Sequence, residues 1–213
     1  MTELTVCCVS RGDEKSLPFL RKMRDWCDRT NSEFLLAIDG ADVPEFSSTC
    51  IKVRSLGYIE SVLDSVIDHC SGDYIFRLDD DEFFSDKLSN WLEQNKSNFE
   101  DDVYSFSRFN LWKNEDYFIP GLYPDTQIRL TTKEKAKGRN KIHNISPYGF
   151  GTTLHLPILH YKFLIRSYEE RKEIAEKYES VSTGAGFGDY LVYNLPEDYY
   201  LAKGVGIFYE RTW

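Results

Sequence analysis

Four adjacent carboxylates, Asp79-Asp80-Asp81-Glu82, directly follow a short apolar segment at residues 74–78. Such a run repels itself unless it is solvated, paired or bound to a hard metal ion, and Mg²⁺ and Mn²⁺ prefer oxygen ligands. The alternative is a solvated acidic turn that caps a helix beginning near Ser85. Because apolar residues flank the run on both sides, we favour the end of a buried strand and predict a divalent metal site there.

A histidine interrupts an apolar stretch late in the chain. His160 lies in the sequence Leu-Pro-Ile-Leu-His-Tyr at residues 156–161, and imidazole is a good ligand for Mn²⁺ and other transition metals. A core histidine with satisfied hydrogen bonds is the common alternative, and spacing alone leaves both interpretations open. The same alternative applies to His143 and His155, which have less to distinguish them.

Polar side chains also follow the other predicted strands. Ser10 and Arg11 follow residues 4–9, and Asp39 follows residues 34–38. Ligands of open parallel sheets bind outside the carboxyl ends of the strands, so these side chains and the acidic run should meet at one edge. Asp39 could accept hydrogen bonds from a base or a ribose, whereas bare carboxylates repel a diphosphate. A bound cation reconciles the two, which predicts a nucleotide diphosphate beside a metal.

The elements that must position these residues alternate along the first part of the chain. Apolar, β-branched runs at residues 4–9, 34–38 and 74–78 predict strands, with a shorter one at 51–53. Apolar residues at helical spacing within 17–27 and 59–70 predict the helices between them. This alternation indicates βαβ units and a parallel sheet.

The second part is organised differently. Residues 103–109 alternate as a half-exposed strand would, and residues 127–130 predict another strand, so the sheet should be mixed. Ser167 and Glu170 fit a capping box for a helix that runs to about Ser180, and a glycine-rich loop follows at 183–188. We expect a single α/β domain over 1–213, with a mixed, mainly parallel sheet flanked by helices.

Five basic residues alternate near the middle of the second part: Lys133, Lys135, Lys137, Arg139 and Lys141. In an extended hairpin they would all project from one face, where they could hold phosphate or an anionic acceptor. An exposed hairpin whose charges prevent edge-to-edge aggregation explains them equally well.

Composition excludes several classes of function. The formal net charge of −9 disfavours binding to nucleic acid or to an anionic membrane surface. Five cysteines without a CxxC pair predict reduced, mostly buried thiols. No apolar run approaches the length of about 20 residues that crosses a bilayer, so we expect no membrane insertion and a cytoplasmic location.

Taken together, these motifs resemble those of the GT-A glycosyltransferases, particularly compact family-2-like enzymes with a strand-end DADE motif. Four segments, in the family's order, carry the resemblance: residues 78–82 (its DxD element), 123–130 (its arginine–leucine strand), 142–143 (its histidine–glutamate site) and 158–161 (its late histidine–tyrosine). The resemblance spans most of the chain. It implies a GT-A, Rossmann-like fold with nucleotide binding in about 1–100 and acceptor binding in about 101–213.

The resemblance also implies residue roles. Asp79 would face the ribose and the metal, Asp81 would bind the metal, His160 would complete the metal site, and Asp39 would contact the base. Ser10, Arg11 and Asp80 would also line the donor site.

The catalytic base is less clear, because family members often have Glu where this chain has Asn144, which cannot act as a base. Asp125 and His143 are the nearest candidates, and Asp80, Glu82 and Asp102 remain open.

The whole chain is also similar to the amino-terminal domains of multidomain chlorovirus glycosyltransferases that build capsid glycans. That similarity implies a UDP-linked glucose or rhamnose donor, a glycan or glycoprotein acceptor, further domains in a longer polypeptide, and the host cytoplasm as location. We expect inversion at the anomeric carbon. A sugar-phosphate nucleotidyltransferase and a non-catalytic carbohydrate- or metal-binding module are the alternatives.

Overall fold

The computed structural model describes residues 4–40, 43–46, 49–112, 114–119, 125–138 and 151–183. The first part alternates strands and helices as expected. Its elements are β1 (Leu4–Ser10), α1 (Leu17–Thr30), β2 (Glu33–Ile38), the 3₁₀ turn η1 (Pro44–Phe46), β3 (Cys50–Lys52), the 3₁₀ turn η2 (Ile59–Ser61), α2 (Leu63–His69) and β4 (Tyr74–Asp79). The predicted helix over 59–70 is thus divided into a 3₁₀ turn and a shorter α-helix.

The second part contributes more strands. Its elements are β5 (Glu82–Phe84), α3 (Asp86–Asn95), β6 (Val103–Trp112), β7 (Asn114–Phe118), β8 (Asp125–Thr132), α4 (Lys133–Ala136), β9 (Thr152–His160), α5 (Lys162–Ile165) and α6 (Tyr168–Val181). Two predicted helix starts are confirmed. The Ser85 side chain accepts a hydrogen bond at the start of α3, and Ser167 and Glu170 form the capping box of α6.

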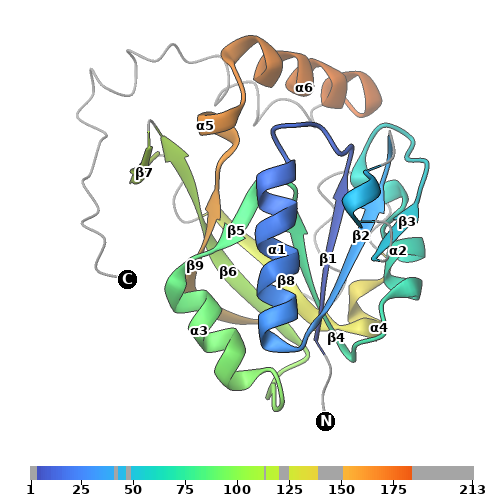
Figure 1. Cartoon of the computed structure of the whole chain (residues 1–213). Helices are drawn as coiled ribbons and strands as arrows, with labels where there is room; N and C mark the ends of the chain where they lie inside the picture. The colour runs from blue at the N-terminus through green and yellow to red at the C-terminus, as the bar shows by residue number, and fades with distance from the viewer. Residues whose placement is uncertain are drawn as a thin grey trace.

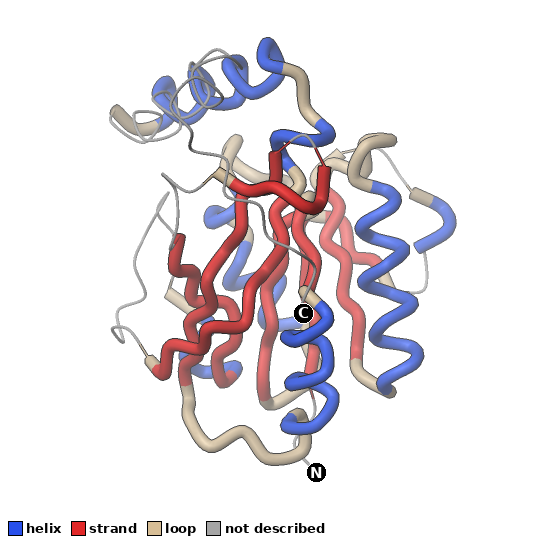
Figure 2. The backbone as a smooth tube through the Cα atoms, turned by 90° about the vertical axis from the view of Figure 1, so that its left-hand side faces the viewer, coloured by secondary structure: helices blue, strands red, loops and turns tan. Residues whose placement is uncertain are grey.

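The strands form a sheet in the order β3-β2-β1-β4-β8-β6-β9-β5, with β7 paired to β6. Six strands of this path (β3, β2, β1, β4, β6 and β9) run in one direction, because β8 and β5 are each antiparallel to their neighbours. The predicted fold class, a mixed and mainly parallel sheet flanked by helices, is confirmed. Helices lie on both sides of the sheet (Figures 1 and 2).

The two faces of the sheet carry separate cores. One core packs side chains of α1 and α3, such as Met23 and Leu88, against Phe76 and Phe106 of the strands. The other packs side chains of α2, such as Val66, against Cys7 and neighbouring strand residues. Both cores consist of apolar side chains removed from water, which is the main source of stability in a fold of this kind.

Two expectations about the second part are wrong. Strand β6 is buried along almost its whole length rather than half-exposed, because β8 and β9 flank it on both edges. The basic run is not an extended hairpin at its start, since Lys133–Ala136 form helix α4. There the backbone N–H of Lys133 donates to Asp73 and its ammonium group donates to Cys70, which fastens the end of β8 to the end of α2. Arg139 and Lys141 lie outside the described residues.

The cysteines and the helices bear on two further expectations. All five cysteines are free and four of them are buried, as predicted. Within the described residues, no helix combines the length and the apolar character that a membrane crossing requires.

Candidate functional site

A cavity of about 480 Å³ opens at the carboxyl edge of the sheet. It lies where β1, β2 and β4 end, and α6 lies over that edge (Figure 1). Most of the predicted site residues line it, namely Ser10, Arg11, Asp39, Asp79, Asp80, Asp81 and His160. Sheet register explains this convergence: Val9 pairs with Ala37 of β2 and with Asp79 of β4, so the three strands end at the same level.

Pairing of β5 with β9 brings His160 to the acidic run. Glu82 and His160 are register partners, and the backbone N–H of Tyr161 donates to the carbonyl of Asp81 at 2.8 Å. As a result, Nε2 of His160 lies 3.3 Å from Oδ1 of Asp81, with both side chains largely buried. Burial alone would raise the pKa of Asp81, but the charge of His160 in its protonated form and its hydrogen bond keep it below its usual value.

Asn110 sets the orientation of the His160 ring. Oδ1 of Asn110 lies 2.5 Å from Nδ1 of His160, and Nδ2 of Asn110 donates to Asp125 at 3.3 Å. Because the amide nitrogen is the donor to Asp125, the amide oxygen must accept from Nδ1–H of His160. In the neutral ring, Nε2 therefore presents a lone pair toward Asp81.

This pair of side chains fits a divalent cation. An imidazole lone pair and a carboxylate oxygen facing each other at 3.3 Å are two acceptors, which a shared cation would reconcile. Among the described residues no set of three histidine, cysteine or carboxylate side chains is arranged to hold a metal. Mg²⁺ and Mn²⁺ sites of nucleotide enzymes commonly use one or two protein ligands and complete the shell with phosphate and water.

Asp79 is engaged elsewhere. Nη2 of Arg129 donates to Oδ2 of Asp79 at 2.7 Å, and Nη1 lies 3.5 Å from Oδ1. Burial alone would raise the pKa of Asp79, but the charges of Arg129 and Arg77 lower it well below its usual range. The structure therefore places the Asp79 carboxylate against an arginine rather than in a shared position with Asp81 and His160.

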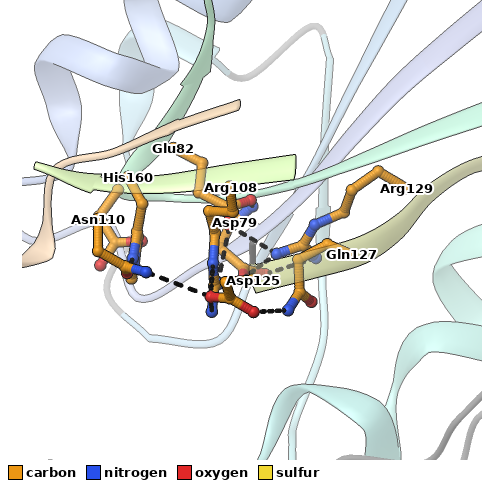
Figure 3. A network of polar contacts seen from close by, with 9 residues as sticks. Asp79, Glu82, Arg108, Asn110, Asp125, Gln127, Arg129 and His160 are labelled. Carbon is orange, nitrogen blue, oxygen red and sulfur yellow. Dashed lines mark hydrogen bonds and ion pairs between the residues drawn. The ribbon is translucent and has the colours of Figure 1, made fainter. Parts of the chain in front are cut away.

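A buried network of charges supports this part of the cavity (Figure 3). Glu82 is fully buried and accepts from Arg129 at 2.6 Å and from Arg108 at 3.1 Å. Arg108 in turn contacts Asp125 at 2.5 Å. Burial alone would lower the pKa of both arginines, but the surrounding carboxylates raise it. Every charge of this network has an opposite charge beside it, which such a buried group requires.

The same network bears on the candidate bases. Asp125 lies beside the cavity rather than in its lining, and its carboxylate accepts from Arg108, Asn110 and Gln127. Burial would raise the pKa of Asp125, but these donors lower it, so its environment suits a positioning role better than that of a base. Glu82 is shielded by its two arginines. Asp102 lies at the other end of β8, where it pairs with Lys135.

Asp80 faces the loop after β1. The hydroxyl of Ser10 donates to Asp80 at 2.6 Å and accepts from the backbone N–H of Gly12, a residue with φ of 70°. Burial and the neighbouring Asp81 raise the pKa of Asp80 to about 7. The predicted grouping of Ser10 with the acidic run is thus observed in the structure. His143 lies outside the described residues, as does most of the predicted glycine-rich loop.

The opposite end of the cavity contains Asp39. The backbone N–H of Ser55 donates to Asp39 at 3.1 Å, and its hydroxyl donates to the other carboxylate oxygen. Burial would raise the pKa of Asp39, but these bonds lower it. The loop turns at Gly57, whose φ of 100° favours glycine, and the Lys177 side chain packs over that residue.

Helix α6 brings a positive charge to this end. Lys177 lies close enough to Arg11 that burial and the Arg11 charge lower its pKa. Two ion pairs hold the segment in place: Arg166 donates to Asp13 at 2.6 Å, and Lys15 pairs with Glu170 at 2.6 Å. Two cations that face one cavity and repel each other form a site that favours an anion.

Four residues of the site escaped the sequence predictions: Ser55, Arg108, Asn110 and Arg129. Arg108 and Asn110 are polar residues in a strand that is otherwise largely apolar, at 103–112, whereas Arg129 lies in a mostly polar strand at 125–132. The interruption of an apolar strand by Arg108 and Asn110 was visible in the sequence. The family resemblance included the Arg129 segment, but it assigned this arginine no role.

No protein-family model and no curated protein matches the sequence. Several solved structures are similar in fold. A putative glucose-1-phosphate thymidylyltransferase from Bacillus anthracis is 10% identical, with a TM-score of 0.51 over 86% of this chain and 96% of that one. HddC from Yersinia pseudotuberculosis is 9% identical, with a TM-score of 0.50 over 84% of this chain and 100% of that one. Identities this low show a shared fold and nothing about activity.

A glycosyltransferase is also among the similar structures. TarS of S. aureus, residues 1–349 with UDP-GlcNAc, is 10% identical, with a TM-score of 0.48 over 93% of this chain and 75% of that one. A TM-score below 0.5 does not establish a shared fold. The predicted similarity to chlorovirus enzymes stays a prediction. What the chain shares with these solved structures is its α/β fold.

Proposed function

We propose that the protein is a metal-dependent glycosyltransferase that moves a sugar from a nucleotide diphosphate donor to an acceptor hydroxyl. One observation carries the proposal: a single cavity at the carboxyl edge of the sheet contains both the Asp81–His160 pair and Asp39. This arrangement fits a ligand whose one end accepts or donates hydrogen bonds at a protein carboxylate and whose other end carries a diphosphate bound through a cation. The motif resemblance to GT-A enzymes agrees with it.

The two ends of the cavity would divide the donor between them. Asp39, oriented by Ser55, would accept hydrogen bonds from the base or the ribose. Arg11, in the loop after β1, and Lys177, on α6, would offset the negative charge of the diphosphate. Uridine is the base that the family resemblance implies, with glucose or rhamnose as the transferred sugar.

Asp81 and His160 would hold Mn²⁺ or Mg²⁺ at the end of the cavity away from Asp39. A metal ion there acts as a Lewis acid toward a departing diphosphate. Asn110 keeps Nε2 of His160 directed at Asp81, and Asp125 keeps Asn110 in place. Asp79 would approach the ribose while Arg129 balances its charge. Asp80 and Ser10 would line the donor site beside it.

The acceptor would enter over β8, whose Gln127 and Arg129 line the cavity. Its hydroxyl must lose a proton as it attacks, a step in which a positioned base commonly contributes ~10²–10⁴-fold. Because Asp125 is held by three donors, we assign it to positioning and propose His143 as the base. With one displacement at the anomeric carbon, the product has inverted configuration. A glycan or glycoprotein acceptor is part of this proposal.

The first test is calorimetric titration of UDP into the protein with and without Mn²⁺. We expect binding that depends on the metal and that is lost in Asp81→Asn, which keeps the side-chain shape but removes the charge. Asp25→Asn is the matched control, because Asp25 is exposed on α1 and, among the described residues, pairs with no cation but its neighbour Arg24 at 3.5 Å. Equal UDP affinity of the wild type with and without metal would contradict the metal role.

A second assay separates the alternatives. Hydrolysis of UDP-glucose or UDP-rhamnose to free sugar and UDP, lost in Asp81→Asn, is the expected result for a transferase without its acceptor. Release of pyrophosphate from UTP and glucose 1-phosphate would instead identify a nucleotidyltransferase. If nucleotide binds and none of these substrates turns over, the protein is a binding module and the proposed activity is wrong.

A further inference from the structure

Two arginines lie side by side on the face of the sheet that lines the cavity. Strands β4 and β8 are antiparallel, and Phe76 pairs with Leu130. Arg77 of β4 follows this last register pair, Arg129 of β8 precedes it, and both arginines line one small cavity. On its other side Arg77 pairs with Cys7 of β1. Like charges placed directly opposite each other on neighbouring strands are destabilising.

The two arginines differ in how their charges are balanced. Arg129 contacts Asp79 and Glu82 at 2.7 and 2.6 Å. The carboxylate that lies on the same strand and the same face as Arg77 is Asp79, which already forms an ion pair with Arg129. Nε of Arg77 is buried and has no hydrogen-bond partner among the described residues. Arg77 therefore shares the carboxylate of Asp79 with Arg129, since the charges of both arginines lower the pKa of Asp79.

A small cavity explains part of this arrangement. It has a volume of about 20 Å³ and is lined by Arg77, Arg129, Cys7 and Thr131, among others. That is room for one water molecule, which could accept from Nε of Arg77 and from Nε of Arg129, also unpartnered among the described residues. A water satisfies hydrogen bonds but leaves the charge in place.

The charge of Arg77 faces the large cavity. Arg77 lines that cavity and is only partly buried. Besides the buried Nε, the guanidinium group has two further nitrogens that can donate hydrogen bonds. A guanidinium fork matches carboxylate and phosphate groups in a bidentate geometry.

We infer that Arg77 binds an anionic group of the acceptor, a carboxylate or a phosphate, on the sheet face beside Arg129. The inference rests on the proposed function, since the donor is assigned to Asp39 at one end and to Asp81 and His160 at the other. Arg77 lies on β4, the strand next to β8, whose Gln127 and Arg129 line the part of the cavity where the acceptor would enter. The acceptor is then an acidic glycan or a phosphate-bearing molecule rather than a neutral sugar.

A stability measurement tests whether the two neighbouring arginines destabilise the fold. Arg77→Gln removes one of the two opposed charges, so in the absence of added anion its melting temperature should rise by about 2–4 °C. A residue with a purely structural role would give a lower melting temperature. Arg29→Gln is the control, because Arg29 is exposed and pairs with Glu93 on the other side of the molecule. A lower melting temperature or failure to fold in Arg77→Gln would overturn the inference.

A binding measurement tests the ligand. Sulfate is titrated into the protein saturated with UDP and Mg²⁺, so that the donor site is filled. Sulfate should bind to the wild type and to Arg29→Gln, bind more weakly to Arg77→Lys, and bind at least tenfold more weakly to Arg77→Gln. Absence of sulfate binding in the wild type, or equal affinity in Arg77→Gln, would overturn the inference.

Three sugars identify the chemistry of the anion. Methyl glucuronide and methyl glucoside differ in one carboxylate, and glucose 6-phosphate carries a phosphate instead. Binding of the glucuronide or the phosphate, but not the glucoside, in an Arg77-dependent manner supports an anionic acceptor and says which group it carries. Equal binding of the glucoside would contradict the inference.

The proposed function is tested separately by UDP titration in the same variants. Arg77→Gln should keep metal-dependent UDP binding while it loses sulfate. If UDP fails to bind, the sulfate titration is run on the protein without nucleotide. Arg77-dependent sulfate binding in that case would refute the transferase proposal and leave an anion site, whereas UDP binding with Arg77-independent sulfate affinity would refute only the anion site.

Discussion

The two faces of strand β4 have opposite characters. Phe76 and Leu78 point to the side of α1 and α3, where they are 0% and 1% exposed. The ring of Phe76 lies 5.0 Å from that of Phe84 and 5.3 Å from that of Phe106. Arg77 and Asp79, which alternate with them, face the cavity instead.

The difference shows how one strand separates stability from chemistry. Successive side chains of a strand point to opposite faces, so a single six-residue element contributes alternately to a closed aromatic core and to an open charged cavity. Substitutions on one face should change the free energy of unfolding. Those on the other should change ligand binding, except where a buried charge loses its partner.

The largest effect should come from the aromatic face. Phe76→Ala should lower the free energy of unfolding by about 3–5 kcal/mol, because it leaves a cavity among rings that cannot collapse around it. Urea denaturation monitored by circular dichroism measures this. UDP affinity of the molecules that remain folded should be unchanged. Loss of UDP binding from a fully folded Phe76→Ala protein would show that the two faces are not separate.

The charged face should be almost as sensitive at Arg129. Arg129→Met should cost about 3 kcal/mol or more, because it removes a partner from Asp79 and from the fully buried Glu82. Arg29→Met is the control and should cost about 1 kcal/mol or less, since its pair with Glu93 is exposed. The double variant Glu82→Gln/Arg129→Met should recover part of the loss. A cost for Arg129→Met as small as the control would contradict the paired network.

A smaller change in free energy should appear in metal affinity at Asn110. Asn110→Leu removes the acceptor of Nδ1 of His160 and should weaken Mn²⁺ binding about 10–100-fold, as loss of such supporting groups typically does. Electron paramagnetic resonance of free Mn²⁺ measures the affinity directly. Gln127→Leu is the matched control, because Gln127 contacts the other oxygen of Asp125 and does not contact His160. Equal weakening in both variants would refute the specific role of Asn110.

The smallest effect should be the acid sensitivity that Asp125 adds. Its donors hold the pKa of Asp125 below the value of an unfolded chain, about 3.9. The stabilisation is therefore complete above that value and is lost as the pH falls through the folded-state pKa. Urea midpoints at pH 7, 5, 4 and 3 should fall less steeply in Asp125→Asn than in the wild type. The exposed Asp102, replaced in Asp102→Asn, should leave the slope unchanged.

Local patterns in the sequence determined much of the fold. Apolar runs located β1, β2 and β4 to within one residue, helical spacing located the start of α1 but not its end, and the Ser167–Glu170 capping box located the start of α6. These features depend on residues close together in the chain. Asp39 and the acidic run each follow an apolar strand in the sequence. Because parallel strands end at the same edge of the sheet, this position predicted that these residues lie along its carboxyl edge.

Tertiary structure alone decided which partners each site residue has. Asp81 meets His160 through the pairing of β5 with β9, and His160 meets Asn110 through the pairing of β9 with β6. Arg129 reaches Asp79 because β8 lies between β4 and β6. No short window of sequence contains these registers. Glu82 and His160 are 78 residues apart along the chain, and Asn110 and His160 are 50 apart, so they meet only when the whole sheet forms.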